Sequence, residues 1–531
     1  YWSKAIWLFH DSPTLTEAFL QKYYDSMILQ AEHIMECHSA YRYMSNWGVI
    51  ENHGLFEIGV CLPQSEKTKQ FIAFAVKNLE VQVRMQIMPD GVHWEQSPMY
   101  HNDVLHCLLD VILLAKRNDI ALPDVILRQT EKMAMADVAW LKPDHHIVMM
   151  GDSDDVDVRD RISVAAYLFL NPVLRFGGFD RFDYESIWDL GMKAGEEYAG
   201  MERRKPDFTS LFLEHSGNTY FRSDWSERAN FLHLHSGTMG AGHGHSDKLH
   251  IDLVVNGEDV LMDGGRYTYV SGPKRFSYKD PSGHNTITVD DLPFTVCKDS
   301  WECSKLSQPV KENFRCTKLA EFAQAGQLGY MDLPGGVYVN RKVVYIKPDL
   351  YVLADEMYTG DRHTYQQYFH FNNHGTVTQN APGEKKFPCV AYRGKMAEAD
   401  FYFVSAQVKA ELKSGHIARH YNVEEENTVC KVTKQGEGFT SLITVIDAQP
   451  GRPLSIEKLP VRSALKQTDY PETMAEALKI TAGEKEYVVI LCHQEVNSPT
   501  DLVEVDGCMG YGNVIVFDKA GDVLVGDVLN W

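Results

Sequence analysis

The chain has 531 residues, 24% of them charged and 44% hydrophobic, with a formal net charge of −21 at pH 7. This length exceeds what one hydrophobic core accommodates, so we expect two or three domains. The negative charge argues against nucleic acid or an anionic membrane as a partner, because both repel a strongly acidic protein. The longest apolar runs, such as residues 104–114, are too short and too polar for membrane insertion.

The N-terminal part of the chain predicts helices. Between residues 19 and 35, apolar side chains recur at steps of three and four, which indicates one buried helical face, and Ser12-Pro13 is expected to open this helix. Similar patterns recur at 71–87, 104–114, 125–141, 162–170 and 184–198. We therefore expect a helical domain over residues 1–204.

After residue 204 the pattern changes to short β-branched or alternating segments separated by glycine-rich turns. The clearest is 249–255, where alternation indicates a strand with one face in the core, followed by Asn256-Gly257 as a tight hairpin turn. Helices first and strands afterwards indicate separate domains, with a sheet domain at 205–440 and a smaller sheet layer at 441–531. Further strands are expected at 218–222, 230–235, 259–263, 285–290, 341–346, 351–356, 366–371, 440–446, 487–491 and 514–523.

The segment His243-Gly244-His245 is the first candidate for chemistry. If it lies on an extended strand, both imidazoles face one space, and with Asp263 and His284 downstream they make a ligand set suited to a zinc-like ion. The ordinary alternative is a pair of solvent-facing strand residues. The glycines around the pair weaken that alternative, because they allow a ligand to approach closely.

Two segments of the helical half are further candidates. Asn52 and His53 offer amide and imidazole donors beside Gly54, although a helix-terminal turn explains the same residues. Ser97-Pro98 is typical of a helix start, which places Tyr100 in the first turn, where the helix dipole favours a phenolate. The ordinary alternative is that Tyr100 and Trp94 are packing residues.

Two other features are less specific. The acidic run 150–157 lacks the glycine and the terminal glutamate of an EF-hand, so we expect a helix-capping turn. Ten cysteines, from Cys37 to Cys508, form no CxxC pair, a pattern typical of free thiols and of a reducing compartment such as the cytoplasm. The chain begins at Tyr1 rather than Met, so we expect it to be processed or cropped, with any targeting segment not visible.

Taken in order, these motifs resemble those of the heparinase II/III family of polysaccharide lyases, over nearly the whole chain. The series is more specific than any one member. It comprises Asn52-His53-Gly54, Asp90-Gly91 with Glu95-x-Ser97-Pro98-x-Tyr100, Arg222-Ser223-x-Trp225, Gly242-His243-Gly244-His245-x-Asp247, Asp263-Gly264-Gly265 and His284-Asn285-Thr286.

The resemblance implies an α+β multidomain protein, with an N-terminal incomplete (α/α) toroid followed by antiparallel β-sandwich layers. Fewer helices precede Asn52 than a full toroid needs, so we expect the N-terminal part to be shortened. The family implies a periplasmic or secreted protein, in contrast to the cysteine usage. No pattern in the sequence indicates an oligomeric state.

The resemblance also implies roles for particular residues. Asn52 and His53 neutralise the uronate carboxylate of the substrate, Tyr100 protonates the leaving oxygen, and His243 assists as base or as partner of Tyr100. If proton and leaving oxygen lie on the same side, Tyr100 serves both steps; if they lie on opposite sides, His53 or His243 is the better base. The implied metal ligands, usually for zinc, are His245, Asp263 and His284.

The expected reaction is β-elimination in an acidic polysaccharide that contains uronic acid. Glycosaminoglycans (heparan sulfate, chondroitin sulfate or hyaluronan) are preferred, and alginate or another uronate is the alternative. The net charge permits such a ligand, because charges beyond about 8 Å are screened at physiological salt. A metal-dependent glycan hydrolase and an inactive carbohydrate-binding module are the competing hypotheses. The residues expected to contact the substrate are Trp47, Trp94, Glu95, Arg222 and Arg275, with surface solvation as the ordinary reading of the arginines.

Overall fold

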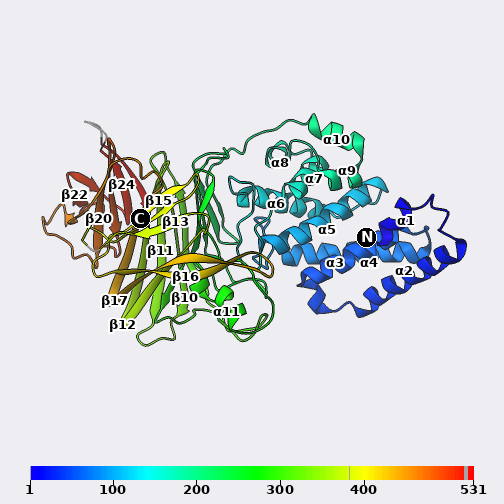
Figure 1. Ribbon diagram of the computed structural model, residues 1–531, viewed down its shortest axis with the longest axis horizontal. Coiled ribbons are helices and arrows are strands. Elements are labelled where there is room, and N and C mark those ends of the chain that lie inside the picture. The colour runs from blue at the N-terminus through cyan, green and yellow to red at the C-terminus, as the bar shows by residue number, and fades with distance from the viewer. Residues whose placement is uncertain (1, 382, 520–523, 531) are drawn as a thin grey trace. The chain divides into compact units, whose positions relative to one another are not determined.

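The computed structural model describes residues 2–381, 383–519 and 524–530, and the chain divides into two compact units. Unit 1 comprises Tyr1–Leu141, His145–Ile147 and Val156–Asp207, and unit 2 comprises Lys142–Asp144, Val148–Asp155 and Phe208–Trp531 (Figure 1). Two short segments from the expected helical range thus belong to the sheet unit. No helix in the described part of the chain has the length and apolarity needed to cross a membrane.

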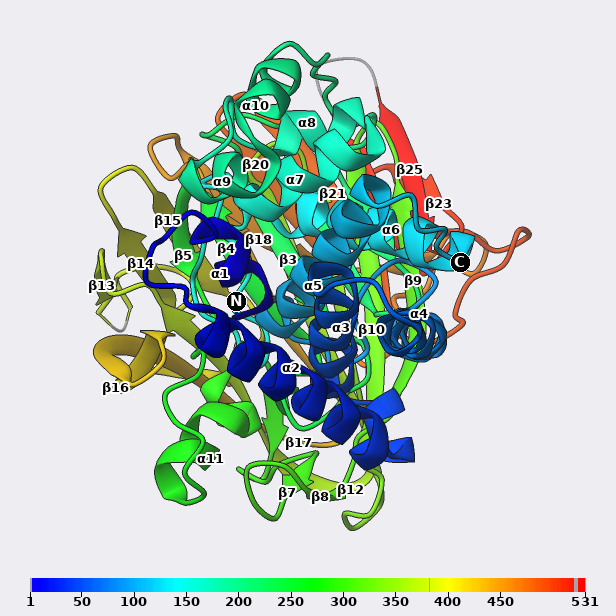
Figure 2. The same cartoon turned by 90° about the vertical axis from the view of Figure 1, so that its right-hand side faces the viewer.

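Unit 1 is built from helices, as the periodicity predicts. Helix α3 packs against both α4 and α5 (Figures 1 and 2), and α5 is the most buried of the three. The helices are α1 (Trp2–Leu8), α2 (Glu17–Cys37), the 3-10 turn η1 (Ala40–Tyr43), α3 (Asn46–Cys61), α4 (Glu66–Gln86), α5 (Pro98–Arg117), α6 (Asp124–Trp140), α7 (Arg159–Phe169), α8 (Pro172–Gly177), α9 (Tyr184–Leu190) and α10 (Met192–Ala199).

Local chemistry sets the helix ends. Pro98 occupies the first helical position of α5, as predicted, because a missing N–H costs nothing there. Ser12-Pro13 does not open α2: Thr16 is the N-cap, and its hydroxyl accepts the N–H of Phe19 at 3.3 Å. The expected single helix over 184–198 is two helices, because Gly191 adopts a positive φ of 91° between them.

Unit 2 is dominated by one antiparallel sheet, in which β12 and β17 are the long central strands (Figure 1). The expected strands 351–356 and 366–371 are the two ends of β12. Among the described residues, this sheet contains β1 (Leu211–Leu213), β2 (Asn218–Arg222), β3 (Phe231–His235), β4 (His250–Val255), β5 (Glu258–Leu261), β6 (Ile287–Val289), β9 (Pro309–Cys316), β10 (Ala320–Tyr330), β11 (Val337–Ile346), β12 (Leu350–Phe371), β13 (Thr376–Gln379), β14 (Cys389–Arg393), β15 (Glu398–Phe403), β16 (Lys409–His420) and β17 (Val423–Asp447).

In the described part of unit 2, three smaller sheets accompany the large one. The first contains β18 (Leu454–Leu459), β20 (Ala475–Ala482), β21 (Lys485–Cys492), β24 (Val514–Asp518) and β25 (Val525–Asn530). The second contains β19 (Arg462–Ser463), β22 (Val503–Val505) and β23 (Cys508–Gly510), and the third β7 (Val296–Cys297) and β8 (Cys303–Lys305). Two short helical segments, α11 (Pro273–Lys279) and η2 (Pro281–Gly283), lie between β5 and β6.

The sheets of unit 2 stack in layers over separate apolar cores. One core lies on one face of the large sheet, and a second lies between its other face and the five-stranded sheet. A third core joins the five-stranded sheet to β22 and β23. The expected boundary at 440/441 falls inside β17, and the C-terminal layer begins at β18. Residues 520–523 of the expected strand 514–523 lie outside the described residues.

The hairpin predicted at Asn256-Gly257 is present between β4 and β5. Both turn residues have positive φ, 48° for Asn256 and 82° for Gly257, as a turn that follows the twist of its two strands requires. The expectation that one face of β4 meets solvent is wrong, because every residue of β4 is buried. Its polar face lies in a network of histidines and aspartates instead.

A buried ion pair holds the centre of the large sheet to the segments that carry the candidate site. Arg341 on β11 lies directly opposite Asp355 on β12, and both are fully buried. Its guanidinium donates to both oxygens of Asp355, at 2.7 and 2.8 Å, and also to the carbonyl oxygens of Leu249 and Asn285. One side chain therefore joins two strands and two loops.

We predict that Arg341→Met lowers the free energy of unfolding by about 3–5 kcal/mol, because it leaves the Asp355 carboxylate buried without a counter-charge. Urea unfolding followed by circular dichroism measures the change. The control is Lys409→Met, which removes an exposed ion pair with Glu411 and should cost less than about 1 kcal/mol. Equal effects for the two variants would contradict a special role for Arg341.

Candidate active site

The histidine-rich segment lies in the loop between β3 and β4. The expectation that His243 and His245 lie on a strand is wrong, but both imidazoles bind one carboxylate, that of Asp152. His243 Nδ1 lies 3.1 Å from Asp152 Oδ2, and His245 Nε2 lies 2.9 Å from Asp152 Oδ1. A single acidic side chain therefore fixes the orientation of both rings.

Asp152 is fully buried and is held by Arg275 from α11. The two guanidinium nitrogens Nη1 and Nη2 contact the two carboxylate oxygens at 2.5 and 2.8 Å. Burial alone raises the pKa of Asp152, but hydrogen bonds from His243 and His245 and the charge of Arg275 hold it well below its ordinary value. Asp152 is therefore an anion that orients both histidines.

Hydrogen bonds to this anion assign the ring protons. Because a carboxylate only accepts, Nδ1 of His243 and Nε2 of His245 carry the protons that face Asp152. The other nitrogen of each ring then bears the lone pair when the ring is neutral. His243 offers Nε2 and His245 offers Nδ1, so the two histidines present opposite nitrogens to their surroundings.

His245, Asp263 and His284 form a buried group whose ligand atoms all lie within 4.8 Å of one another. Among the described residues, neither His245 Nδ1 nor His284 Nε2 has a hydrogen-bond partner, although both atoms are buried. Burial lowers the pKa of His245 to about 4, so its ring is neutral. Two imidazoles with buried nitrogens that lack a partner among the described residues, together with one carboxylate, fit a divalent cation such as zinc.

Buried polar side chains of β2, β3 and β4 extend this cluster. His233 and His235 lie opposite Asp252 and His250 in the strand register, and His233 Nδ1 lies 3.0 Å from Asp252 Oδ2. The side-chain oxygen Oδ1 of Asn218 lies 2.9 Å from His233 Nε2 and 3.0 Å from His235 Nδ1. Sequence reasoning missed this network, although the alternation in residues 231–235 places both histidines on one face.

In unit 1, Asn52 and His53 are neighbours on α3 but point toward different helices, because successive helical residues are turned by about 100°. Asn52 is fully buried; its amide donates to the Gly48 carbonyl at 2.8 Å, and its oxygen accepts from Asn78 of α4 at 3.4 Å. His53 faces Asp110 of α5, with Nε2 2.7 Å from Oδ2. The expected helix-terminal turn is therefore absent at these residues.

The environment of His53 favours its charged form. Burial lowers the pKa of His53, but the hydrogen bonds and charges of Asp110 and Cys107 together outweigh burial and raise it to about 10. Asp110 also accepts from Lys4 Nζ at 2.5 Å, and Lys4 lies 3.5 Å from Glu57. His53, Glu57 and Asp110 have metal-ligand spacing, but the ammonium of Lys4 already supplies the cation between the two carboxylates.

The remaining predicted residues of unit 1 lie near the start of α5 or at the start of α3. Tyr100 is the third residue of α5 and is half-buried, as is Trp94, whereas Glu95 is buried. Trp47 lies in the first turn of α3, is 59% exposed, and has the guanidinium of Arg42 5.4 Å from its ring. Trp47 is thus accessible to a sugar ring.

The two predicted substrate-binding arginines are buried, so their reading as solvated surface residues is wrong. Arg222 lies between the rings of Trp225 and Phe231, at 4.2 and 4.7 Å, and burial lowers its pKa to about 9. Arg275 is fully buried on Asp152. Both guanidinium groups contact protein groups, which indicates a structural contribution in each case.

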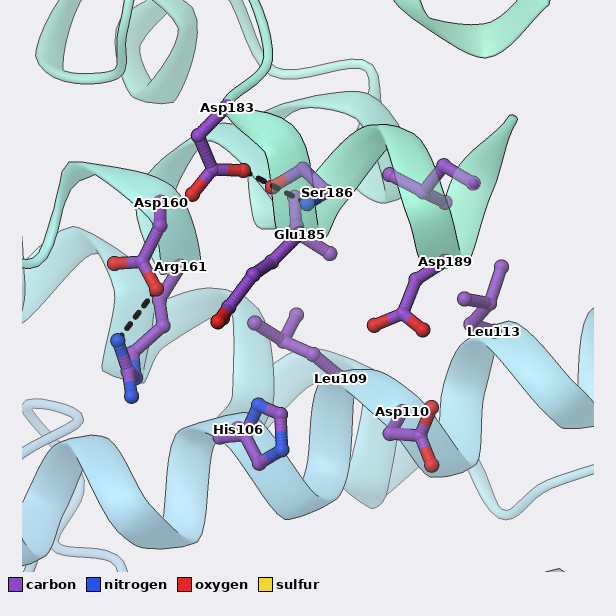
Figure 3. A pocket seen from close by; sticks show the side chains of 12 residues that line it. His106, Leu109, Asp110, Leu113, Asp160, Arg161, Asp183, Glu185, Ser186 and Asp189 are labelled. Atoms are coloured by element: carbon purple, nitrogen blue, oxygen red, sulfur yellow. Dashed lines mark hydrogen bonds and ion pairs between the residues drawn. The ribbon is translucent and has the colours of Figure 1, made fainter. Parts of the chain in front are cut away.

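A pocket in unit 1 is lined by α5, α7 and α9 (Figure 3). Two basic side chains, Arg161 and His106, face the carboxylates, and Arg161 contacts Asp160 at 2.5 Å. The negative side chains outnumber them, so this pocket does not suit a sulfated or uronate group. Its five carboxylates are those of Asp110, Asp160, Asp183, Glu185 and Asp189.

Comparison with known protein families gives a match in each of the two units. The heparinase II/III N-terminus matches residues 2–172, and the heparinase II/III-like C-terminal region matches residues 205–453. The helical unit and the sheet unit thus carry the two successive parts of one family. The chain belongs to the heparinase II/III family.

The relatives agree with this assignment. A heparin-sulfate lyase of Pedobacter heparinus is 25% identical over 315 residues, which cover 56% of this chain and 43% of that protein. One of Bacteroides thetaiotaomicron is 22% identical over 371 residues, covering 66% and 49%. The chain therefore spans less than half the length of these relatives.

A crystal structure of a heparan sulfate lyase from Pedobacter heparinus has the same fold, with a TM-score of 0.71 at 19% identity. The match covers 93% of this chain and 73% of that one. Together with the helices of unit 1 and the layered sheets of unit 2, this likeness confirms the predicted fold class, a helical toroid followed by antiparallel β-sandwich layers.

We predict that His53 keeps its proton across the neutral range and loses it at about pH 10, compared with an ordinary histidine pKa of about 6.5. Because the folded pKa is raised, the pair with Asp110 stabilises the fold fully below about pH 6.5, and this stabilisation is lost as pH rises through about 10. Nitrogen NMR of labelled histidine rings measures the titration.

Asp110→Asn removes the hydrogen bond and the charge of Asp110, which raise the pKa of His53, and leaves burial, which lowers it, and Cys107, which raises it. We expect the pKa of His53 in this variant to fall below its wild-type value of about 10. Asp124→Asn, which removes an exposed carboxylate paired with Arg128, is the control and should leave His53 unchanged. A wild-type titration near pH 6 would contradict the assignment of His53 as an imidazolium.

Proposed function

We propose that this protein is a polysaccharide lyase that cleaves a uronic-acid-containing glycosaminoglycan by β-elimination, with heparan sulfate as the first candidate and chondroitin sulfate and hyaluronan next. The observation that carries the proposal is the match of both heparinase regions to successive parts of the chain. The printed names of the relatives, heparin-sulfate lyases, support the substrate class.

The first requirement of the reaction is to make the C5 proton of the uronate acidic. That proton is scarcely acidic while the adjacent carboxylate is ionised, so charge that develops on the carboxylate has to be stabilised. His53 suits this role, because its raised pKa makes it a cation at neutral pH. The resemblance implies Asn52 as the second donor, a role that requires its buried amide to exchange the hydrogen bond that it donates to the Gly48 carbonyl. Removing one such donor typically costs about 10²–10³ in kcat.

The second requirement is to move two protons. His243 suits the base, because its Nδ1 proton faces anionic Asp152 and leaves Nε2 with a lone pair. As in other catalytic carboxylate–histidine pairs, the carboxylate sets the tautomer of the ring and stabilises the imidazolium that forms. Tyr100, in the first turn of α5, then protonates the leaving C4 oxygen.

One divalent metal ion, zinc by its ligand preference, completes the proposed site on His245, Asp263 and His284. When bound, the ion fixes the geometry of the loop beside His243 and does not need to activate water. Asp152 and Arg275 hold His245 from its other side, the support that metal-bound histidines ordinarily have.

We predict that incubation with heparan sulfate generates the ultraviolet absorbance of an unsaturated uronate, and that Tyr100→Phe lowers kcat about 10²–10⁴-fold with little change in KM. Tyr184→Phe, at an exposed tyrosine, is the control. Heparan sulfate, chondroitin sulfate, hyaluronan and alginate form the panel. Cleavage without new absorbance would point to a hydrolase, and binding without cleavage to a carbohydrate-binding module.

We predict that the purified protein binds about one zinc ion per chain, measured by elemental mass spectrometry after dialysis. His284→Ala and Asp263→Asn should each lower the zinc content at least about 10-fold, since outer-shell changes alone typically cost 10–100-fold in metal affinity. His215→Ala, at an exposed histidine, is the control. No binding by the wild-type protein in a zinc titration would refute the metal site independently of activity.

A further inference from the structure

A small hairpin packs beside the histidine loop. Among the residues that the structure describes, strands β7 and β8 (labelled in Figure 2) pair only with each other. Lys298 N–H donates to the Glu302 carbonyl at 2.7 Å across the hairpin. A lone two-stranded hairpin is marginally stable in water. Its position therefore depends on side-chain contacts.

The hairpin carries two cysteines directly opposite each other. Cys297 pairs with Cys303 in the strand register, and their sulfur atoms lie 2.7 Å apart, both as free thiols. Opposed residues in antiparallel strands have Cα atoms about 4.5–5.5 Å apart. This separation lies inside the range of about 4.4–6.8 Å that a disulfide requires, so the bond forms without moving the backbone.

The two thiols are chemically different. The hydrogen bond from Cys297 lowers the pKa of Cys303, while burial opposes it and the nearby ammonium of Lys279 assists. The hydrogen bond to Cys303 raises the pKa of Cys297, and burial adds to it. Since the thiolate is the attacking form, Cys303 is the nucleophile and Cys297 the resolving thiol.

Trp301, at the tip of the hairpin, contacts His243, the proposed base. The ring of Trp301 lies edge-on to His243 at 5.3 Å and stacks on Tyr269 at 5.2 Å. A Cβ atom on Gly242 would lie 3.0 Å from the Trp301 ring, so the loop backbone is in close contact with the indole. Trp301 is itself 53% exposed, so only its inner face is covered.

Two further contacts join the hairpin to the same loop. Lys279 Nζ donates to the Gly242 carbonyl at 2.6 Å and to the Ser300 carbonyl at 3.3 Å. The sulfur of Cys303 lies 3.7 Å from that of Met239. A change in the hairpin therefore reaches the loop directly before His243.

We propose that Cys297 and Cys303 are a reversible dithiol–disulfide pair, and that the disulfide fixes Trp301 against His243. The link to turnover rests on the proposed lyase function. The disulfide closes only a short loop, so it restricts the unfolded chain less than a long-range bridge does. Its main effect is to rigidify the hairpin.

The oxidant is an external disulfide, such as oxidised glutathione. The Cys303 thiolate attacks one of its sulfurs, forming a mixed disulfide and releasing one thiolate. The deprotonated Cys297 sulfur then attacks the Cys303 sulfur and releases the second thiolate. In balance, the cysteines lose two protons and two electrons, and the external disulfide is reduced to two thiols.

The covalent step is tested on the full chain in glutathione buffers of graded potential, with alkylation of free thiols and peptide mass spectrometry. We expect a 297–303 disulfide that dithiothreitol reverses, while Cys316, an exposed cysteine on β9, stays alkylatable. Cys297→Ser should accumulate a glutathione adduct at Cys303 faster than Cys303→Ser accumulates one at Cys297. Failure of the disulfide to form at any potential would overturn the proposal.

The coupling to His243 is tested by nitrogen NMR of labelled histidine rings, which requires no turnover. Oxidation should shift the His243 resonances in the wild type and in Cys316→Ser, but not in the double variant Cys297→Ser with Cys303→Ser, and much less in Trp301→Ala. Unchanged His243 resonances in an oxidised wild-type chain would overturn the coupling whether or not the protein is a lyase.

The effect on catalysis is measured separately, as kcat and KM of the oxidised and reduced chains on the cleaved polysaccharide. We expect the oxidised form to have a kcat/KM about 10-fold higher, because small displacements of a catalytic group cost factors of this size. Trp301→Ala should remove the difference. Equal kinetics of the two forms would overturn the catalytic effect, whereas absence of turnover in both forms refutes the proposed function and not the disulfide.

Discussion

The constraint on which the candidate site of the sheet unit depends is the buried negative charge of Asp152. An isolated carboxylate is very costly to bury, so it is found only where a counter-charge and hydrogen bonds compensate it. Arg275 supplies the charge through two contacts, and the rings of His243 and His245 each supply a hydrogen bond. The histidine loop is therefore positioned by the requirement to satisfy this carboxylate.

The Asp152 carboxylate also explains why the two histidines have different proposed roles. The carboxylate contacts Nδ1 of His243 and Nε2 of His245. The second nitrogen of His245, Nδ1, therefore belongs to the proposed metal cluster, and the second nitrogen of His243, Nε2, is the proposed proton acceptor. The segment that carries Asp152 is itself anchored in the sheet unit, since Arg266 Nε donates to Oδ1 of Asp154, two residues further along the chain, at 2.7 Å. One carboxylate thus sets two tautomers.

His53 and His245 show how a carboxylate and its surroundings decide whether a buried histidine is charged. Both rings are hydrogen-bonded to an aspartate, yet the pKa of His53 is raised to about 10 and that of His245 is lowered to about 4. Burial lowers both values. At His53 the hydrogen bonds and charges of Asp110 and Cys107 together outweigh burial, whereas at His245 burial and the charge of Arg275 outweigh the contact with Asp152. The proposed reaction needs this difference, because one histidine meets an anion and the other a cation.

Local patterns in the sequence predicted the fold well, and long-range pairing limited what could be predicted of the site. The helical periodicity predicted α5, and Asn256-Gly257 predicted the hairpin between β4 and β5, because both features depend on nearby residues. Asp152 was read as part of a capping turn, since nothing local indicates that it pairs with residues about a hundred positions away. Arg275 was predicted to contact the substrate, with surface solvation as the alternative, and its burial on Asp152 could not be predicted for the same reason. Cys297 and Cys303 were read as free thiols because their spacing matches no familiar motif, and only the strand register brings them together.

The burial of Arg222 and Arg275 bears on how an acidic protein recognises an acidic polysaccharide. With a net charge of −21, long-range attraction does not bring the proposed substrate to the surface. Repulsion is screened beyond about 8 Å at physiological salt, so it does not prevent binding either. The buried arginines are engaged with Asp152 and with aromatic rings, and the pocket beside Asp110 is acidic. Recognition in the proposed reaction therefore rests on a few groups at contact distance. Among these, cationic His53 matters most, because its proposed role is to bind the carboxylate whose charge grows as the C5 proton leaves.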